Sequence, residues 1–152
     1  MMIKRLLLAI AVLLLAPSAF AQQQVQITAD LFTVDENTHE AVFTGNVVVV
    51  HPTVKVWAAK VVAVYGDAGP SDIESFVASG SVRLVTSEQE ATGEQAVFTP
   101  GDQLLRLTGN VEVVNSGGTI AAGELVVNLA TNVSTFTSAG DGGRVTGVFT
   151  SQ

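Results

Sequence analysis

The chain has 152 residues, a formal net charge of −7 and no cysteine. Without cysteine it can form no disulfide, and it offers neither a thiol nucleophile nor a thiolate metal site. Its negative charge opposes binding to phosphate backbones, so nucleic acid is not an expected partner.

Residues 1–21 have the organisation of a secretory signal peptide. A short basic segment precedes an apolar run of 11 residues, 6–16, and Ala19 and Ala21 form an A-x-A cleavage signal. The run is shorter than the roughly 20 apolar residues of a membrane-spanning helix. We therefore expect cleavage before Gln22 and a single mature domain of residues 22–152. Retention of the run as a membrane anchor is the alternative.

The rest of the sequence has the composition of short β-strands. After Ala21 it contains 24 valines and 15 threonines but only 7 leucines, and β-branched side chains favour pleated strands over helices. Apolar and polar residues alternate, as in 105–107 and 111–113. Turn residues separate these runs at 44–46, 66–70, 100–102, 116–118 and 140–143. The pattern predicts an all-β fold of antiparallel strands.

A repeat of about 30 residues runs through this region. The sequence TGNV at 44–47 returns at 108–111, with a weaker copy, SGSV, at 79–82. The central glycines are 35 and 29 residues apart, and we expect a fainter fourth copy at Gly140. A second element, usually a small, a polar and an apolar residue, recurs at 29–31, 59–61, 93–95 and 123–125. Such units cannot bury their own apolar face, so they are expected to stack along an axis.

The residues around the three glycines predict which face is interior. Positions two and four residues before and after each glycine are all apolar: Ala41, Phe43, Val47, Val49, Phe76, Ala78, Val82, Leu84, Leu105, Leu107, Val111 and Val113. Charged residues occur only at odd offsets, as at Arg83, Arg106 and Glu112. Because side chains alternate between the faces of a strand, the even positions face one interior, and each glycine marks a bend. This interior is either a filled core or an elongated apolar groove.

Five segments resemble, in their order and spacing, the LptA/OstA-like family of periplasmic lipopolysaccharide transport proteins. They are VQITAD at 25–30, AVFTGNV at 41–47, KVWAAKVV at 55–62, LRLTGNV at 105–111 and IAAGEL at 120–125. The resemblance extends over roughly residues 25–149. It implies an OstA-like β-jelly-roll, a folded-over taco of stacked, bent antiparallel strands.

The resemblance also implies a function. The chain is expected to be a periplasmic carrier that shields the acyl chains of lipid A in a trough, and so helps to bridge the inner and outer membranes during outer-membrane assembly in Gram-negative bacteria. We expect the trough to be lined by Ile27, Ala41, Phe43, Val47, Val49, Val56, Phe76, Val82, Leu84, Leu105, Leu107, Val111, Val113, Ile120 and Phe136.

Partners follow from the same resemblance. They are lipopolysaccharide, the OstA-like domains of the inner- and outer-membrane transport components, and further copies of the chain joined head to tail. Open sheet edges invite strand addition, and the expected edges contain Val25 and Ile27 at one end and Val145 and Val148 at the other. Two alternatives remain, namely an inner-membrane-anchored sister of the same system and a periplasmic β-scaffold without a lipid ligand.

Other signals are weaker. His39 and His51 do not have the spacing of a zinc site, so no metal site is expected. The sequence has no P-loop, G-x-G-x-x-G or G-x-S-x-G motif, so we expect neither catalytic residues nor a cofactor. Arg83, Arg106 and Arg144 either meet lipid phosphates or lie on solvated strand faces. Trp57 lies on the face opposite Val56, either exposed or partly buried under a loop.

Overall fold

The computed structural model describes residues 25–140 and 143–151, so the predicted signal peptide lies outside the described residues. Within these ranges the chain forms ten strands and no helix. The strands are β1 (Gln26–Thr28), β2 (Leu31–Asp35), β3 (Glu40–Val50), β4 (Lys55–Tyr65), β5 (Ile73–Val85), β6 (Gln89–Thr99), β7 (Leu104–Asn115), β8 (Gly118–Asn128), β9 (Val133–Thr137) and β10 (Thr146–Phe149). The predicted all-β fold is confirmed.

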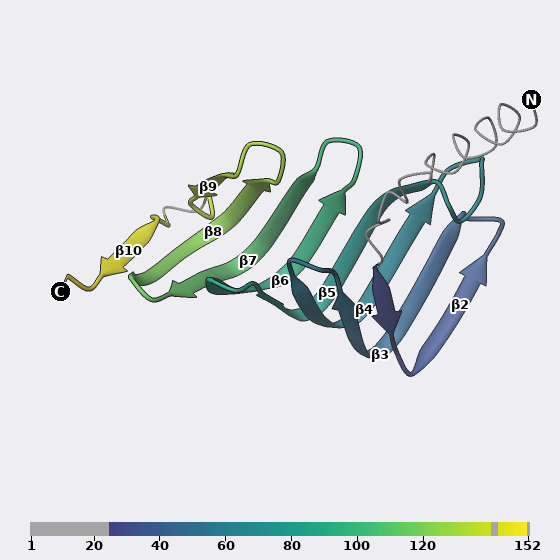
Figure 1. Ribbon diagram of the computed structural model, residues 1–152, viewed down its shortest axis with the longest axis horizontal. Helices are drawn as coiled ribbons and strands as arrows, with labels where there is room; N and C mark the ends of the chain where they lie inside the picture. Colours follow the sequence, from purple (N-terminus) through teal and green to yellow (C-terminus); the bar gives the residue numbers. More distant parts are fainter. Residues whose placement is uncertain (1–24, 141–142, 152) are drawn as a thin grey trace, which may run out of the picture.

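All ten strands belong to one antiparallel sheet. Strands β3 to β8 pair in chain order, so each strand contacts its sequence neighbours, and they stack along one axis (Figure 1). Two short strands flank each end, with β1 and β2 both pairing with β3, and β9 and β10 both pairing with β8. The sheet is not closed, because no pairing joins the β1 and β2 end to the β9 and β10 end among these strands.

The predicted glycine turns lie near the centres of β3, β5 and β7, where these strands bend. The register shifts between Thr44 and Val47 on β3, and equivalent shifts occur on β5 and β7. The two residues at each shift both have positive φ: Gly45 and Asn46, Gly80 and Ser81, and Gly109 and Asn110. Left-handed backbone favours glycine and tolerates asparagine, which explains why the repeat carries glycine followed by asparagine or serine.

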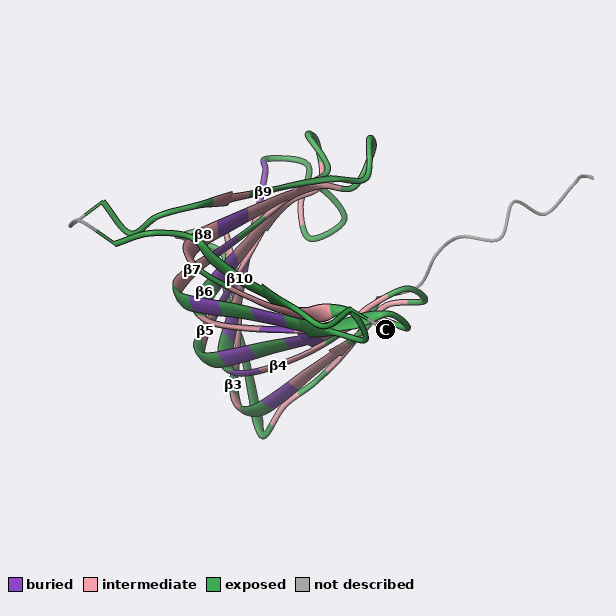
Figure 2. Ribbon diagram, turned by 90° about the vertical axis from the view of Figure 1, so that its left-hand side faces the viewer, coloured by how far each residue is buried: buried purple, intermediate pink, exposed green. Residues whose placement is uncertain are grey.

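The bends divide the sheet into two half-sheets that form the arms of a V (Figure 2). The β2–β9 half-sheet contains β2, β9 and the parts of β3 to β8 that pair between them, and the β1–β10 half-sheet contains β1, β10 and the remaining parts. We call the V's apex the corner, its open side the mouth, and the strand-joining turns beside the mouth the two rims.

Unbroken apolar rows cross the inner faces of both half-sheets. On the β2–β9 half-sheet, one registered row is Phe32, Phe43, Val61, Ala78, Ala96, Leu107, Leu125 and Phe136. On the β1–β10 half-sheet, one row is Ile27, Val49, Val56, Leu84, Ala91, Val113, Ile120 and Gly147. In the described part of the chain no polar or charged side chain is buried, so the core lies between these faces.

The second repeated element lies at the corner, against the glycines. A Cβ built on Gly45 would lie 2.6 Å from the Asp30 carboxylate, and one built on Gly109 would lie 2.5 Å from that of Glu94. The asparagine after each glycine donates a 3.1 Å side-chain hydrogen bond to the same carboxylate, Asn46 to Asp30 and Asn110 to Glu94. The two elements are therefore parts of one corner.

The predicted fourth copy at Gly140 does not form a bent strand. Gly140 has positive φ but lies outside any strand, in the connection between β9 and β10. The chain there makes two short strands, one for each half-sheet, in place of one long bent strand.

Candidate functional site

The fifteen predicted lining residues lie on the inner face. Seven are buried: Ala41, Val47, Val82, Leu84, Leu107, Val111 and Val113. Eight are half-buried: Ile27, Phe43, Val49, Val56, Phe76, Leu105, Ile120 and Phe136. All except Ala41 and Ile120 belong to one apolar cluster that joins the two half-sheets.

Burial is deepest beside the corner and decreases toward the mouth on β5 to β8. On β7, Leu107 is 1% exposed, whereas Leu105, one row nearer the mouth, is half-buried. The same step separates Ala78 from Phe76 on β5. Side chains at the corner thus fill the interior, and the row closer to the rim retains accessible apolar surface.

That accessible row contains residues that the sequence prediction missed. Phe76, Phe98, Leu105 and Val127 are in register across β5 to β8 and are all half-buried; we call them the mouth row. The Phe76 and Phe98 rings stack with centroids 6.4 Å apart. Phe98 and Val127 were not predicted, although each lies four residues after a corner residue, Glu94 or Gly123. The repeated element does not align them, because Phe98 lies five residues after Gly93 and Val127 lies four residues after Gly123.

The sheet ends expose apolar side chains. Of the predicted edge residues, Val25, Val145 and Val148 are 46%, 42% and 64% exposed, and Ile27 is half-buried in β1. The prediction covered only the edges of the β1–β10 half-sheet. The edges of the other half-sheet also carry exposed side chains, among them Leu31 and Phe32 on β2 and Val133 on β9.

Two of the three arginines in the described residues pair with carboxylates on outer faces. Arg83 Nη2 donates a 3.3 Å hydrogen bond to Glu90, and Arg106 Nη1 donates a 3.0 Å bond to Glu124. Arg83 lowers the pKa of Glu90 through this pairing, and Glu90 in turn raises the pKa of Arg83. Both arginines are on exposed strand faces that point away from the apolar interior.

Trp57 is also on an outer face, on β4. Its cross-strand neighbours are Val48 and Arg83. The Lys55 Nζ lies 5.0 Å and the Arg83 Cζ 4.8 Å from the indole centroid. The ring is half-buried by these cations and by strand neighbours.

The structure provides no evident catalytic constellation in its described parts. A hollow of about 470 Å³ at the corner is lined by Glu94, Thr108, Gly109, Asn110, Gly123, Glu124, Ser138 and Ala139. Its two carboxylates make it unsuitable for acyl chains. Residues 25–140 and 143–151 contain no group of three or more His, Asp or Glu side chains that could hold a metal ion. The same residues include no helix with the length and apolar character needed to cross a membrane.

Comparisons with known proteins agree with this geometry. The profile of the family described as "LptA/(LptD N-terminal domain) LPS transport protein" matches residues 26–133. An uncharacterized protein of Rhizobium meliloti (strain 1021) is 31% identical over 130 residues, which cover 81% of this chain and 69% of that protein. The crystal structure of LptH, the LptA-homologous periplasmic component of the lipopolysaccharide transport device of Pseudomonas aeruginosa, superposes with a TM-score of 0.72 at 18% identity. It covers 85% of this chain and 96% of LptH.

The superposition confirms the predicted OstA-like jelly roll, and the profile match covers most of the chain between β1 and β9. The family whose profile matches residues 26–133 is a family of transport proteins. A site built from apolar walls agrees with a transport role of that family. The chain belongs to the LptA/(LptD N-terminal domain) family of lipopolysaccharide transport proteins.

Proposed function

We propose that this protein is a non-enzymatic periplasmic carrier that holds the acyl chains of lipopolysaccharide between its two half-sheets. The observation that carries the proposal is the pair of apolar inner faces that extend across eight strands, with no buried charged side chain in the described residues. Burying each CH₂ of an acyl chain is worth about 0.8 kcal/mol. Long tails therefore gain ample affinity from such walls, and lipid transfer needs no catalytic group.

The tails would contact the mouth row and not the corner. Leu107 and Val111 are each 1% exposed, so an acyl chain can reach them only if the core separates. Phe76, Phe98 and Leu105 keep accessible apolar surface in adjoining strands. A tail lying across the strands along this row would replace solvent at each side chain in turn, because the row continues from strand to strand.

The open ends would join neighbouring domains into a bridge between membranes. Pairing of β9 with β2 of the next domain, and of β10 with β1, would continue both half-sheets and both apolar faces. Unpaired edge strands supply the backbone groups for this addition. The exposed side chains Phe32, Val133 and Phe149 lie on these edges and would be covered by it.

The test is site-specific photo-crosslinking in cells, combined with mass spectrometry of lipids extracted from the purified protein. A photoreactive residue at Phe76 is expected to capture lipopolysaccharide. The matched control is the next residue, Val77, which is also half-buried but lies on the outer face. Equal adducts at both positions, or none at Phe76, would refute the carrier and favour a scaffold without a lipid ligand.

The position of the mature N-terminus separates the carrier from a membrane-anchored sister. Mass spectrometry of the mature protein is expected to find Gln22 as the first residue. Retention of residues 6–16 would instead indicate an anchored component of the same transport system.

A further inference from the structure

The row that contains the mouth row continues onto β4 and β3, and its exposure changes there. Phe76 is in register with Ala63 on β4, and Ala63 is in register with Ala41 on β3. Phe76 is half-buried, whereas Ala63 is 3% and Ala41 is 9% exposed. Neither alanine belongs to the apolar cluster that joins the two half-sheets, so other atoms cover them. The accessible part of the groove therefore extends over β5 to β8 and stops at β4.

Tyr65 is the side chain that reaches across this part of the inner face. It lies at the end of β4, two residues after Ala63, and is 5% exposed. Because side chains alternate along a strand, it shares the inner face with Ala63. Its hydroxyl donates a 3.4 Å hydrogen bond to the backbone carbonyl of Asp35 at the end of β2. Strand β3 lies between β4 and β2, so the side chain crosses β3 beside Ala41.

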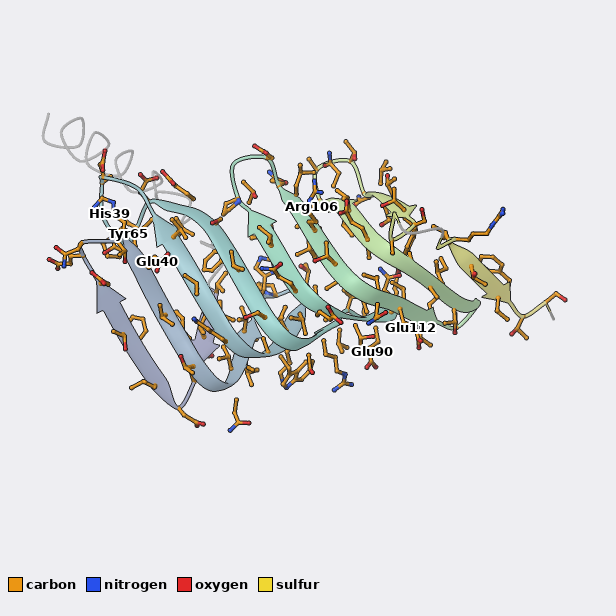
Figure 3. The ribbon with its side chains drawn as sticks, turned by 180° about the vertical axis from the view of Figure 1, so that it is seen from behind. His39, Glu40, Tyr65, Glu90, Arg106 and Glu112 are labelled. Atoms are coloured by element: carbon orange, nitrogen blue, oxygen red, sulfur yellow. The ribbon has the colours of Figure 1, made fainter. Side chains whose placement is uncertain are left out.

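Three contacts hold the Tyr65 side chain in this position. Its backbone N–H donates a 3.0 Å hydrogen bond to the carbonyl of His39, which continues the pairing of β4 with β3. The rings of Tyr65 and His39 stack with their centroids 5.4 Å apart and an angle of 12° between their planes. Figure 3 shows the two side chains together at the rim of the β2–β9 half-sheet. Since the hydroxyl bond to Asp35 fixes the far end, the side chain is anchored along its whole length.

We propose that Tyr65 is the end wall of the acyl groove, a residue that stops a bound tail at β5 and so sets the tail length that the groove accepts. The proposal rests on the carrier function and specifies which part of the groove a tail occupies. A tail that extends past Phe76 has to break the stack on His39 and the bond to Asp35, and an alkyl chain replaces neither. Beyond the wall the inner face is accessible again at Val34 on β2, which is 44% exposed and in register with Ala41.

Photo-crosslinking on the two sides of Tyr65 tests the wall. The purified mature protein is loaded with lipopolysaccharide at a concentration at which it sediments as a monomer, so that no neighbouring copy supplies a tail. A photoreactive residue at Phe76 is expected to capture lipid, and one at Val34 is expected to capture none. In Tyr65→Ala, capture at Val34 should appear while capture at Phe76 persists. Equal capture at both positions in the wild type would overturn the proposal, as would no capture at Val34 in Tyr65→Ala.

Tail length provides a second measurement, which a purely structural role of Tyr65 would not change. The probes are lysophosphatidylcholines that differ only in tail length, each used below its critical micelle concentration. Each CH₂ that the groove buries is expected to strengthen binding about fourfold. The affinity of the wild type should stop rising once the tail reaches Tyr65, and that of Tyr65→Ala should rise further. Tyr65→Phe keeps the ring and should keep the wild-type limit. The same limit in Tyr65→Ala would overturn the proposal.

Two further variants separate the wall from a general loosening of the interior. Tyr65→Leu keeps apolar bulk at a buried position but is too short to reach Asp35, so it should also admit lipid to Val34, and it replaces Tyr65→Ala if that variant does not fold. Phe98→Ala removes an inner-face ring from the open part of the groove and is the matched control. Capture at Val34 in Phe98→Ala would overturn the proposal, because any cavity would then admit the tail. Thermal unfolding verifies that each variant is folded.

Failure of this proposal is distinguishable from failure of the carrier function. Capture at Phe76 together with equal capture at Val34 in the wild type refutes the wall and leaves the carrier intact. No capture at Phe76 in the wild type or in Tyr65→Ala refutes the carrier, and the wall with it.

Discussion

A Cβ built on Gly80 would lie 2.6 Å from the Cβ of Ala59 on the neighbouring strand. Gly80 also has a φ of +81°, which L side chains rarely adopt. Gly80→Ala therefore requires both a strained backbone and a separation of β4 from β5 at the corner. We expect a loss of about 1–3 kcal/mol in the free energy of unfolding, measured by urea denaturation.

Gly101→Ala is the control for this substitution. Gly101 lies in the turn between β6 and β7, and a Cβ there would meet nothing within 4 Å. The urea unfolding midpoint of the Gly101→Ala variant should equal or exceed that of the wild type, because alanine lowers the entropy of the unfolded chain. Equal stability of both variants would show that the corner tolerates a side chain at Gly80.

Two leucines on β7 separate packing from ligand contact. Leu107 is 1% exposed at the corner, so Leu107→Ala should cost about 2–5 kcal/mol of stability. Leu105 is half-buried in the mouth row, so Leu105→Ala should cost less stability and reduce the amount of co-purified lipid. Urea denaturation and lipid mass spectrometry measure the two effects. Suppose instead that the two variants are equally stable and that only Leu107→Ala loses co-purified lipid. That result would contradict the division between the corner and the mouth row.

The sequence was sufficient to predict much of this architecture, because the repeated positions are occupied by residue types with strict backbone preferences. Glycine followed by asparagine marks the bends on β3 and β7, and strand alternation then orients the neighbouring side chains. The prediction missed Phe98 and Val127 because β6 and β8 bend at Glu94 and Gly123, where no glycine–asparagine pair occurs.

The strand pairing at the sheet ends could not be predicted from local sequence. Residues 26–28 and 31–35 are too short to reveal that they pair with different halves of β3. The contact between Trp57 and Arg83 could not be predicted either. The two residues are 26 positions apart in the sequence, and only the register between β4 and β5 places them side by side. Long-range register, and not residue type, decides both features.

The proposed assembly through sheet edges predicts that β10 is sensitive to charge. Val148 is 64% exposed on this edge strand, and a lysine on an edge strand opposes the addition of another strand. Val148→Lys should therefore shift the protein toward monomer in sedimentation velocity. Val114→Lys is the control, since Val114 is 44% exposed but lies on β7, inside the sheet. Equal sedimentation of both variants would argue against assembly through β10.

The ion pair between Arg83 and Glu90 predicts a pH dependence with a definite sign. The hydrogen bond from Arg83 is the main cause of the lowered pKa of Glu90, and their charge attraction adds to it. The folded protein therefore binds fewer protons at Glu90 than the unfolded chain does near the ordinary glutamate pKa of about 4.3. The stabilisation is complete above that value and is lost as the pH falls through the lowered pKa.

Arg83→Gln removes the hydrogen bond and the charge that lower the pKa of Glu90. The titration midpoint of the Glu90 carboxyl, measured by NMR, should therefore rise toward the ordinary glutamate value. Arg106→Gln, which breaks the pair with Glu124 on the other half-sheet, should leave the Glu90 midpoint unchanged. Because Glu90 is exposed, solvent screens the pair and the effect on global stability should be small. A Glu90 midpoint that is the same in the wild type and in Arg83→Gln would mean that the two side chains do not pair in solution.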